Sequence, residues 1–128
     1  MVSLPTPAEK SAARFDTHWD APGTAVITVH GEIDAANADE FADYALRHAD
    51  QISRLVLDVR GVEFFATAGF AALQGLHVRC AGESIAWCAV PSTAVTRLLV
   101  LCDPESELPR HDDVDAAVDS LQLVSKSR

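Results

Sequence analysis

The chain has no long run of apolar residues. Its apolar stretches are short and interrupted by charged side chains, and none approaches the roughly 20 residues that a helix needs to span a bilayer. The first residues, Met1 to Pro7, also lack the basic-then-apolar pattern of a secretory signal. We therefore expect a cytoplasmic protein that makes no direct contact with a membrane.

Basic residues are few and scattered. Ten Lys and Arg residues stand against 19 Asp and Glu, which gives a formal net charge of −9 at pH 7. A surface that binds nucleic acid needs clustered Lys and Arg to meet the phosphates. The composition therefore argues against a nucleic-acid partner, and it suits a protein partner that presents a basic surface.

The common motifs of phosphate-binding and hydrolytic sites are missing too. The sequence contains no G-x-G-x-x-G, no G-x-x-x-x-G-K-[ST] and no G-x-S-x-G pattern. The five histidines fall on separate predicted elements, and none forms the i, i+4 pair that places two metal ligands on one helix face. The acidic group Asp112, Asp113 and Asp115 suits the start of a helix, where carboxylates are favoured. We predict a protein that is not an enzyme and that needs no metal or cofactor.

Cysteine is scarce. Cys80, Cys88 and Cys102 show no C-x-x-C spacing, and each lies on an apolar face of its predicted element. The simplest interpretation is that all three are buried, reduced thiols that act as small hydrophobic side chains. A redox switch made from a pair of these cysteines is the alternative hypothesis.

Strand and helix patterns alternate along a chain of 128 residues, which has room for one domain. Apolar or alternating runs predict five strands, at 15–19, 26–30, 55–59, 84–90 and, short and isolated, near Leu108. Apolar residues at helical spacing predict four helices, which begin at Asn37, Thr67, Ser92 and Asp112 or Asp113. The turn signal Pro22-Gly23 joins the first two strands and predicts that they pair antiparallel.

These elements predict an α/β fold. The central sheet is small and mostly parallel, has four to five strands with an antiparallel N-terminal edge strand, and is covered by about four helices. We place this domain at residues 13–124, after a flexible N-terminal tail (1–12) and before a polar C-terminal tail (125–128).

The most informative segment is Val62–Phe70, with the sequence VEFFATAGF. It lies between an apolar strand pattern and a helical one, so we predict a strand-to-helix loop that opens onto a helix N-terminus. Unpaired N–H groups make such a terminus partly positive and suited to a negative group. Thr67 is the predicted N-cap of this helix. At the preceding helix, Asn37 with Glu40 three residues later predicts a capping box.

Three stretches together resemble the STAS domain, the fold of bacterial anti-sigma factor antagonists. Val26–Ala38 resembles the family's strand, Gly-Glu-Leu-Asp turn and first helix start; Leu55–Gly69 resembles its second strand and switch loop; Cys88–Leu99 resembles its third strand and the helix that follows. The resemblance extends over about residues 14–122. It implies a bacterial, cytoplasmic protein that regulates transcription by protein–protein interaction, through control of a sigma factor.

The switch loop departs from the family pattern at its chemically active positions. The family loop usually reads Phe-x-Asp-Ser-Ser-Gly-Leu, and the resemblance implies that its second Ser is phosphorylated by the anti-sigma factor, which is a kinase. In this chain Ala68 stands at that position and Ala66 replaces the loop Asp. Ala68 has no hydroxyl to carry the roughly −1.5 to −2 charges of a phosphate. Thr67 is the candidate substitute phosphosite.

The resemblance also implies a partner-binding surface at the starts of two helices, formed by Asp34, Asn37, Ala66, Thr67, Ala68, Gly69 and Phe70. We hypothesise an anti-sigma factor antagonist-like module that docks a kinase-type anti-sigma factor and lacks the usual phosphoacceptor. Two alternatives are an accessory subunit of a lipid-transport ATPase complex and a STAS module that senses a small ligand or a redox change.

Overall fold

The computed structural model describes residues 12–126. Within them, four strands form one sheet in the order β1-β2-β3-β4. The strands are β1 (Ala13–Ala21), β2 (Thr24–Ile33), β3 (Arg54–Phe65) and β4 (Ala86–Pro91). The helices are α2 (Ala38–Ala45), α3 (Thr67–Gly82), α4 (Thr93–Cys102) and α5 (Val114–Lys126), and a short 3-10 turn, η1, spans Ala49–Gln51.

The sheet is mixed, as the sequence predicts. β1 pairs antiparallel with β2 across the tight turn at Pro22-Gly23, where Gly23 adopts a φ of 80° that suits glycine. β2, β3 and β4 are parallel to one another. The α/β fold with an antiparallel N-terminal edge strand is therefore confirmed. The strand predicted near Leu108 is reduced to a single bridge between Ala89 and Arg110.

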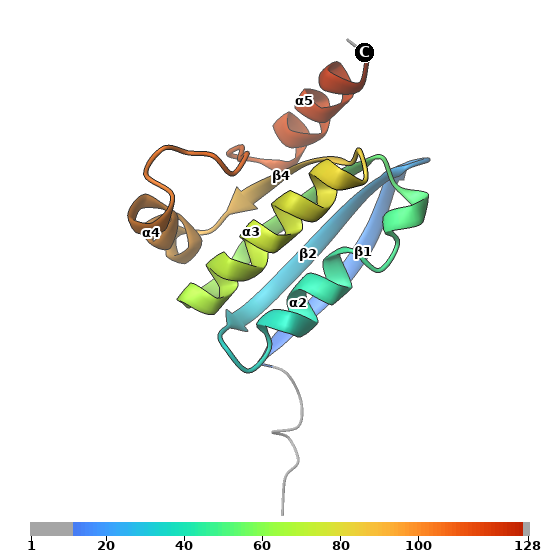
Figure 1. The fold of residues 1–128 in the computed structure, drawn as a ribbon. Coiled ribbons are helices and arrows are strands. Elements are labelled where there is room, and N and C mark those ends of the chain that lie inside the picture. The colour runs from blue at the N-terminus through green and yellow to red at the C-terminus, as the bar shows by residue number, and fades with distance from the viewer. Residues whose placement is uncertain (1–11, 127–128) are drawn as a thin grey trace, which may run out of the picture.

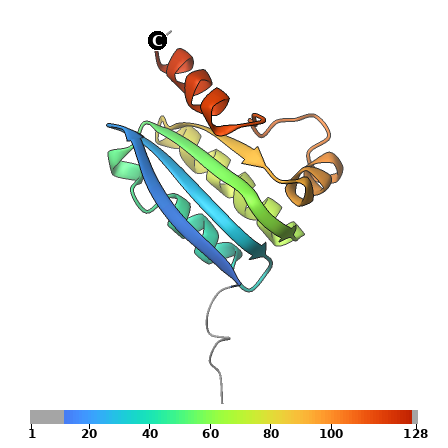
Figure 2. The ribbon, with the colours of Figure 1, turned by 180° about the vertical axis from the view of Figure 1, so that it is seen from behind.

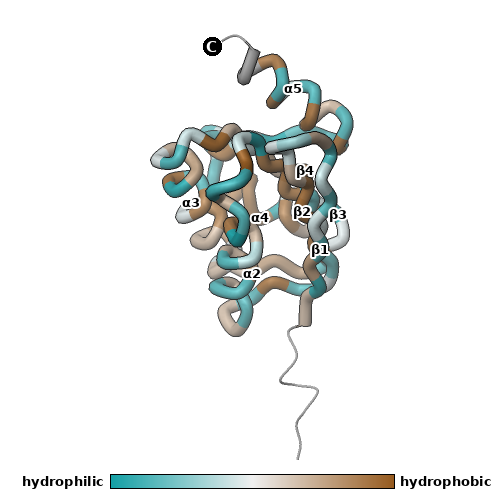
Figure 3. Tube along the Cα trace, turned by 90° about the vertical axis from the view of Figure 1, so that its right-hand side faces the viewer, coloured by the Kyte–Doolittle hydropathy of each residue, from teal (hydrophilic) through white to brown (hydrophobic). Residues whose placement is uncertain are grey.

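Helices cover the two faces of the sheet unequally (Figures 1 and 2). α2 and α3 lie side by side over one face, whereas α5 lies on the opposite face near β4. The larger core, between the sheet and α2, α3 and α4, contains Leu55, Leu57, Phe41 and Leu73. Seen from the side in Figure 3, hydrophobic colour gathers along β2 and β4, beside the helical layer.

A smaller core lies beneath α5. Its buried members on the helix are Ala117, Val118 and Leu121, the apolar face that helical spacing predicts for this segment. They pack against strand residues that face away from the larger core, including Val56 and Val90. Burial on both faces explains why β3 begins as a nearly continuous apolar run.

One prediction about β3 is wrong, because the strand is longer than its pattern indicates. It runs to Phe65, so most of the predicted switch loop is strand and Ala66 alone separates β3 from α3. The pairing of β3 with β2 shifts register twice, after Thr28 and after Gly31. Each shift adds a residue to β3, so its core-facing side chains continue at a spacing of three, through Val62 to Phe65. For that reason, a search for apolar residues at every second position follows the strand only as far as Val59.

The predicted tails lie at the limits of the described residues. All but the last residue of the N-terminal tail predicted at 1–12 lies outside them. At the other end α5 runs to Lys126, so the polar tail predicted to begin at residue 125 overlaps the last turn of this helix. No helix within residues 12–126 is long and apolar enough to cross a membrane.

Two glycines allow a paired test of where the backbone can accept a side chain. Gly31 has a φ of 107°, and a Cβ there would lie 2.2 Å from the carbonyl oxygen of Ala12. Gly75 lies within α3, where a Cβ would meet nothing within 4 Å. We expect Gly31→Ala to lower the free energy of unfolding by roughly 1–3 kcal/mol and Gly75→Ala to raise it by roughly 0.5–1 kcal/mol. Urea denaturation measures both, and changes of the same sign would contradict this description.

Candidate functional site

The starts of α2 and α3 meet at one edge of the sheet. β2 and β3 are parallel neighbours, and Ile33 at the end of β2 lies opposite Phe65 at the end of β3. The N–H of Ala66 donates to the carbonyl of Ile33 at 2.9 Å and ties the two chain segments together. The carboxyl ends of parallel strands are where ligand and partner sites commonly form. The structure therefore brings the two predicted site segments together.

Asn37 fixes the turn that leads into α2. Its side chain is buried, with Nδ2 donating to the carbonyl of Glu32 at 2.8 Å and Oδ1 accepting from the N–H of Asp34 at 2.9 Å. Asp34 Oδ1 in turn accepts from the N–H of Ala36 at 2.9 Å. Asn37 is the residue before the first turn of α2, but its side chain caps no helical N–H, and Glu40 is exposed. The predicted capping box is therefore wrong, because the amide is used to hold the turn.

The N-terminus of α3 has no side-chain cap. Ala66 is the N-cap residue, and its carbonyl accepts from the N–H groups of Gly69 and Phe70 at 2.8 and 3.3 Å. Thr67 is the first helical residue and is exposed. The prediction that Thr67 caps the helix is wrong by one position, because β3 continues to Phe65. No acidic residue in the first turn offsets the partial positive charge of this terminus.

Gly69 sets how closely α3 approaches the sheet. A Cβ at this position would lie 2.6 Å from the ring of Phe65. The missing side chain lets the first turn of α3 pack directly on that ring, which itself lies edge-on to Phe41 of α2 at 6.4 Å. A side chain at this position would push the start of α3 away from the ring that also contacts α2.

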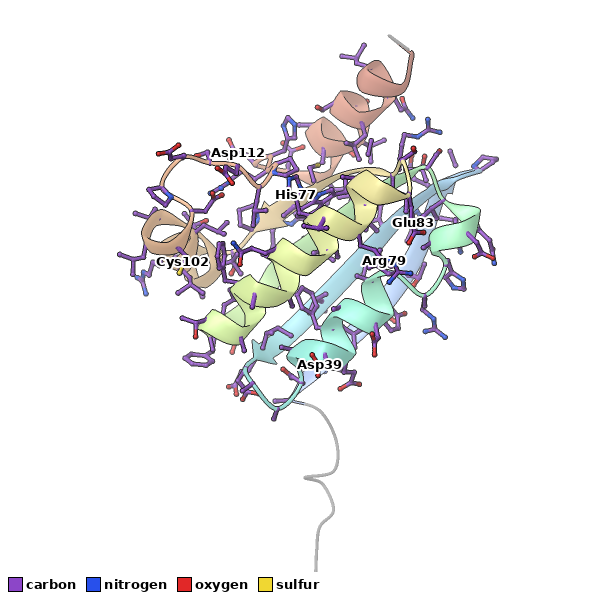
Figure 4. The ribbon with its side chains drawn as sticks, viewed as in Figure 1. Asp39, His77, Arg79, Glu83, Cys102 and Asp112 are labelled. Atoms are coloured by element: carbon purple, nitrogen blue, oxygen red, sulfur yellow. The ribbon has the colours of Figure 1, made fainter. Side chains whose placement is uncertain are left out.

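A groove of about 470 Å³ runs between α2 and α3. Most of its lining side chains are small: Ala35, Ala38, Ala42, Ala68, Ala71, Ala72 and Gly75. Asp39, Asp43 and Arg79 add charge, and Arg79 forms an ion pair with Glu83. Figure 4 shows Arg79 on α3 beside Glu83, with Asp39 near the start of α2. We refer to these lining residues as the small-residue groove. The motif pointed to Ala68, but not to the charged residues, because Asp39 and Asp43 lie on α2 and Arg79 lies in the last turn of α3.

Phe70 lies apart from this groove. It lines a separate cleft of about 260 Å³ between α3 and the segment after α4, together with His77, Cys102 and Leu108. His77 Nδ1 accepts from Trp87 Nε1 at 3.0 Å, which satisfies the N–H of a buried tryptophan. The predicted surface is thus divided: Ala68 faces the groove between α2 and α3, and Phe70 faces the cleft beside α4.

Two other carboxylates, on β3 and before α5, have structural partners. Asp58 is buried within β3 and is held by Arg60 at 2.9 and 3.0 Å. Asp113 Oδ1 accepts from the N–H of Ala116 at 2.7 Å, the capping role predicted for the acidic group. Within residues 12–126, no group of three or more His, Cys, Asp or Glu side chains could hold a metal ion.

The cysteines occupy different environments. Cys80 belongs to the larger core and Cys88 to the smaller one, so the sheet lies between these two thiols. Burial raises the pKa of each to about 11. Cys102 is only half-buried. A redox switch that pairs Cys80 with Cys88 is disfavoured by this arrangement.

Thiol labelling tests that description. With a pKa of about 11, Cys80 and Cys88 are almost entirely protonated at pH 7 and shielded from reagent. We expect a chromogenic disulfide reagent to label one thiol per native chain rapidly, at Cys102, and all three after denaturation. Three equally fast reactions in the native protein would contradict the burial of the other two.

Asn37 offers a test of the turn before α2. Asn37→Ala removes the partners of a backbone carbonyl and a backbone N–H, and we expect the free energy of unfolding to fall by about 1–3 kcal/mol. Asp43→Ala, an exposed change on the same helix, serves as the control and should stay within about 0.5 kcal/mol of the parent. Urea denaturation of both variants checks this, and equal losses would mean that Asn37 has no special role.

Comparisons with known proteins identify a domain family and a curated relative. The STAS domain matches residues 20–117. Osmosensory protein A of Mycobacterium tuberculosis is 33% identical over 100 residues, which cover 75% of this chain and 63% of that relative. The chain thus spans less than two thirds of the curated relative that it matches.

The solved structures that share the fold include two anti-sigma factor antagonists. An anti-sigma factor antagonist from Mycobacterium paratuberculosis superposes with a TM-score of 0.77 at 24% identity, over 93% of this chain and 99% of its own. The anti-sigma factor antagonist SpoIIAA in its unphosphorylated form gives 0.70 at 13% identity, over 85% and 96% of the two chains. At these identities the likeness establishes the fold alone.

Proposed function

The chain belongs to the STAS domain family, and we propose that it is a binding module of the anti-sigma factor antagonist kind. In this proposal it docks a kinase-type anti-sigma factor through the starts of α2 and α3 and the small-residue groove between them. It acts by binding and not by catalysis. The observation that carries the proposal is the position of Ala68, which lines this groove from the first turn of α3.

The groove suits a protein partner because its lining side chains are short. Alanine and glycine leave the backbones of α2 and α3 accessible, so a helix or loop of a partner can approach closely. The turn before α2 is held by Asn37 and Asp34, and the start of α3 is tied to β2 through Ala66. A surface that is rigid before binding loses little conformational entropy on docking.

The charges favour a basic partner surface. Asp39 and Asp43 line the groove, whereas the positive charge of Arg79 is already paired with Glu83. The formal net charge of −9 adds a long-range field of the same sign. Such a field speeds the encounter with a positively charged partner and disfavours an acidic one.

Ala68 removes the usual means of release. A phosphate on this residue would add about −1.5 to −2 charges to the groove that Asp39 also lines, and repulsion and desolvation would separate the complex. The methyl group cannot accept a phosphate, so the protein stays competent to dock unless Thr67, exposed one residue earlier, is modified instead. We propose a constitutive antagonist in the absence of that modification.

A charge placed at the phosphoacceptor position tests the docking surface. We expect Ala68→Glu to weaken binding to a cognate kinase-type anti-sigma factor at least about tenfold, because it buries an unpaired carboxylate at the interface. Ala116→Glu, the same change at an exposed site on α5, is the matched control and should leave the dissociation constant unchanged. Calorimetry measures both. Equal affinities for the two variants would place the interface elsewhere.

Intact-mass analysis after incubation with the anti-sigma factor and ATP tests the missing switch. We expect unchanged mass and retained binding for the parent chain, and phosphorylation with release for Ala68→Ser. Phosphate mapped to Thr67 of the parent chain would overturn the constitutive model. If affinity capture recovers a transport ATPase and no anti-sigma factor binds at micromolar concentration, the proposed function itself fails.

A further inference from the structure

Phe64 is turned out of the core by a shift in strand pairing. Where β3 pairs with β2, the shift after Gly31 adds Glu63 to β3 as an extra residue. Simple alternation from Val62 would place Phe64 in the larger core. The added residue gives that place to Phe65 instead, and Phe64 is left 53% exposed. The residue that alternation would bury is therefore the one that the fold exposes.

Phe64 lies on the far face of the sheet, meaning the side opposite α2 and α3. Its partner in the register of β2 is Glu32, and the next pair is Ile33 with Phe65, which both belong to the larger core. Successive side chains of a strand point to opposite faces, so Glu32 and Phe64 point away from that core. Figure 2 views the far face, with β1, β2 and β3 in front of α2 and α3.

The helix α5 covers a different part of the far face. The smaller core beneath it contains Val26 and Val56, which are register partners near the starts of their strands. Phe64 is eight residues beyond Val56, or roughly 25 Å along β3. Figure 2 shows α5 at one end of the sheet and the arrowhead of β3 at the other. Phe64 therefore lies beside the carboxyl edge, at the end where α2 and α3 begin.

Phe64 and the small-residue groove share this edge of the sheet. Ala68, which lines the groove, is four residues beyond Phe64, so their Cα atoms are at most about 14 Å apart. A protein interface of ordinary size covers about 800 Å² on each partner, which corresponds to a patch about 30 Å across. One partner surface can therefore contact both the groove and Phe64 by extending around the edge.

Carboxylates flank Phe64 on both strands. Glu32 is its register neighbour on β2, Glu63 precedes it on β3, and both are exposed. Glu63 also lines a hollow of about 280 Å³ on the far face, together with His30 of β2 and Arg14 of β1. The positive charge of Arg14 thus lies two strands away from Phe64. An aromatic side chain between carboxylates is complementary to an apolar pocket with a basic rim.

We propose that the protein partner extends around the carboxyl edge of the sheet onto the far face, where Phe64 anchors it. The partner supplies an apolar pocket for the ring and basic side chains at the rim of that pocket. Aromatic residues that become fully buried in this way account for much of the binding energy of protein interfaces. This inference rests on the proposed function, since the partner is the one that docks at the small-residue groove.

Calorimetry with the cognate kinase-type anti-sigma factor tests the anchor. We expect Phe64→Ala to raise the dissociation constant at least about tenfold, and Phe64→Leu, which keeps a large apolar side chain, to raise it less. Leu123→Ala shortens another exposed apolar side chain, on α5, and should leave the dissociation constant unchanged. Thermal unfolding of each variant separates lost contact from lost fold, because each substituted side chain is exposed and the midpoints should stay near that of the parent.

A charge reversal beside Phe64 tests the basic rim. We expect Glu32→Lys to raise the dissociation constant at least about threefold at low salt and less at high salt. Asp119→Lys makes the same change in net charge at an exposed site on α5, so it controls for the long-range field. Equal effects of the two reversals would overturn the basic rim.

The variant Ala68→Glu distinguishes this inference from the proposed function. If Ala68→Glu weakens binding while Phe64→Ala binds as tightly as Leu123→Ala, the anchor is overturned and the proposed function stands. If the parent chain does not bind the anti-sigma factor at micromolar concentration, the proposed function fails and this inference fails with it.

Discussion

The parallel pairing of β2 with β3 is the constraint on which the site depends. It places the two strand ends next to each other, although they are 32 residues apart at the pair Ile33 and Phe65. The hydrogen bond from Ala66 to Ile33 then fixes the start of α3 against the end of β2. The groove lies between α2 and α3 because both helices leave the sheet from this edge and lie side by side over it.

Local packing turns this edge into a surface with a definite shape. Gly69 allows α3 to rest on Phe65, and Asn37 holds the chain before α2 with two backbone hydrogen bonds. Between the helices the side chains are short, so the groove is open and its walls are held by the core beneath. The same first turn of α3 that touches the groove through Ala68 reaches the cleft beside α4 through Phe70. One helix start thus contributes to two separate surfaces.

Several parts of this arrangement were predictable, for reasons that can be stated. The strand from Leu55, the helix after Thr67 and the apolar face of α5 rest on local periodicity, which survives folding. The order of the elements was enough to predict the mixed sheet. The end of β3 was not predictable from alternation, because two register shifts change the spacing of its core residues from two to three. Both predicted helix caps were also wrong. Because β3 runs to Phe65, the N-cap of α3 is Ala66. The side-chain amide of Asn37 hydrogen-bonds within the turn before α2 and so caps no helical N–H group.

The sequence by itself determined the kind of residue at each chemical position: a methyl group at Ala68, a glycine at Gly69, an excess of negative charge and no clustered cations. These are properties of composition and motif, and no fold can alter them. Only the tertiary structure decided which of these residues share a surface. It joined Ala68 to Asp39 and Arg79, separated Phe70 from them, and placed Cys80 and Cys88 on opposite faces of the sheet. Such relations depend on long-range strand pairing and on the direction in which each helix leaves the sheet, and local sequence carries neither.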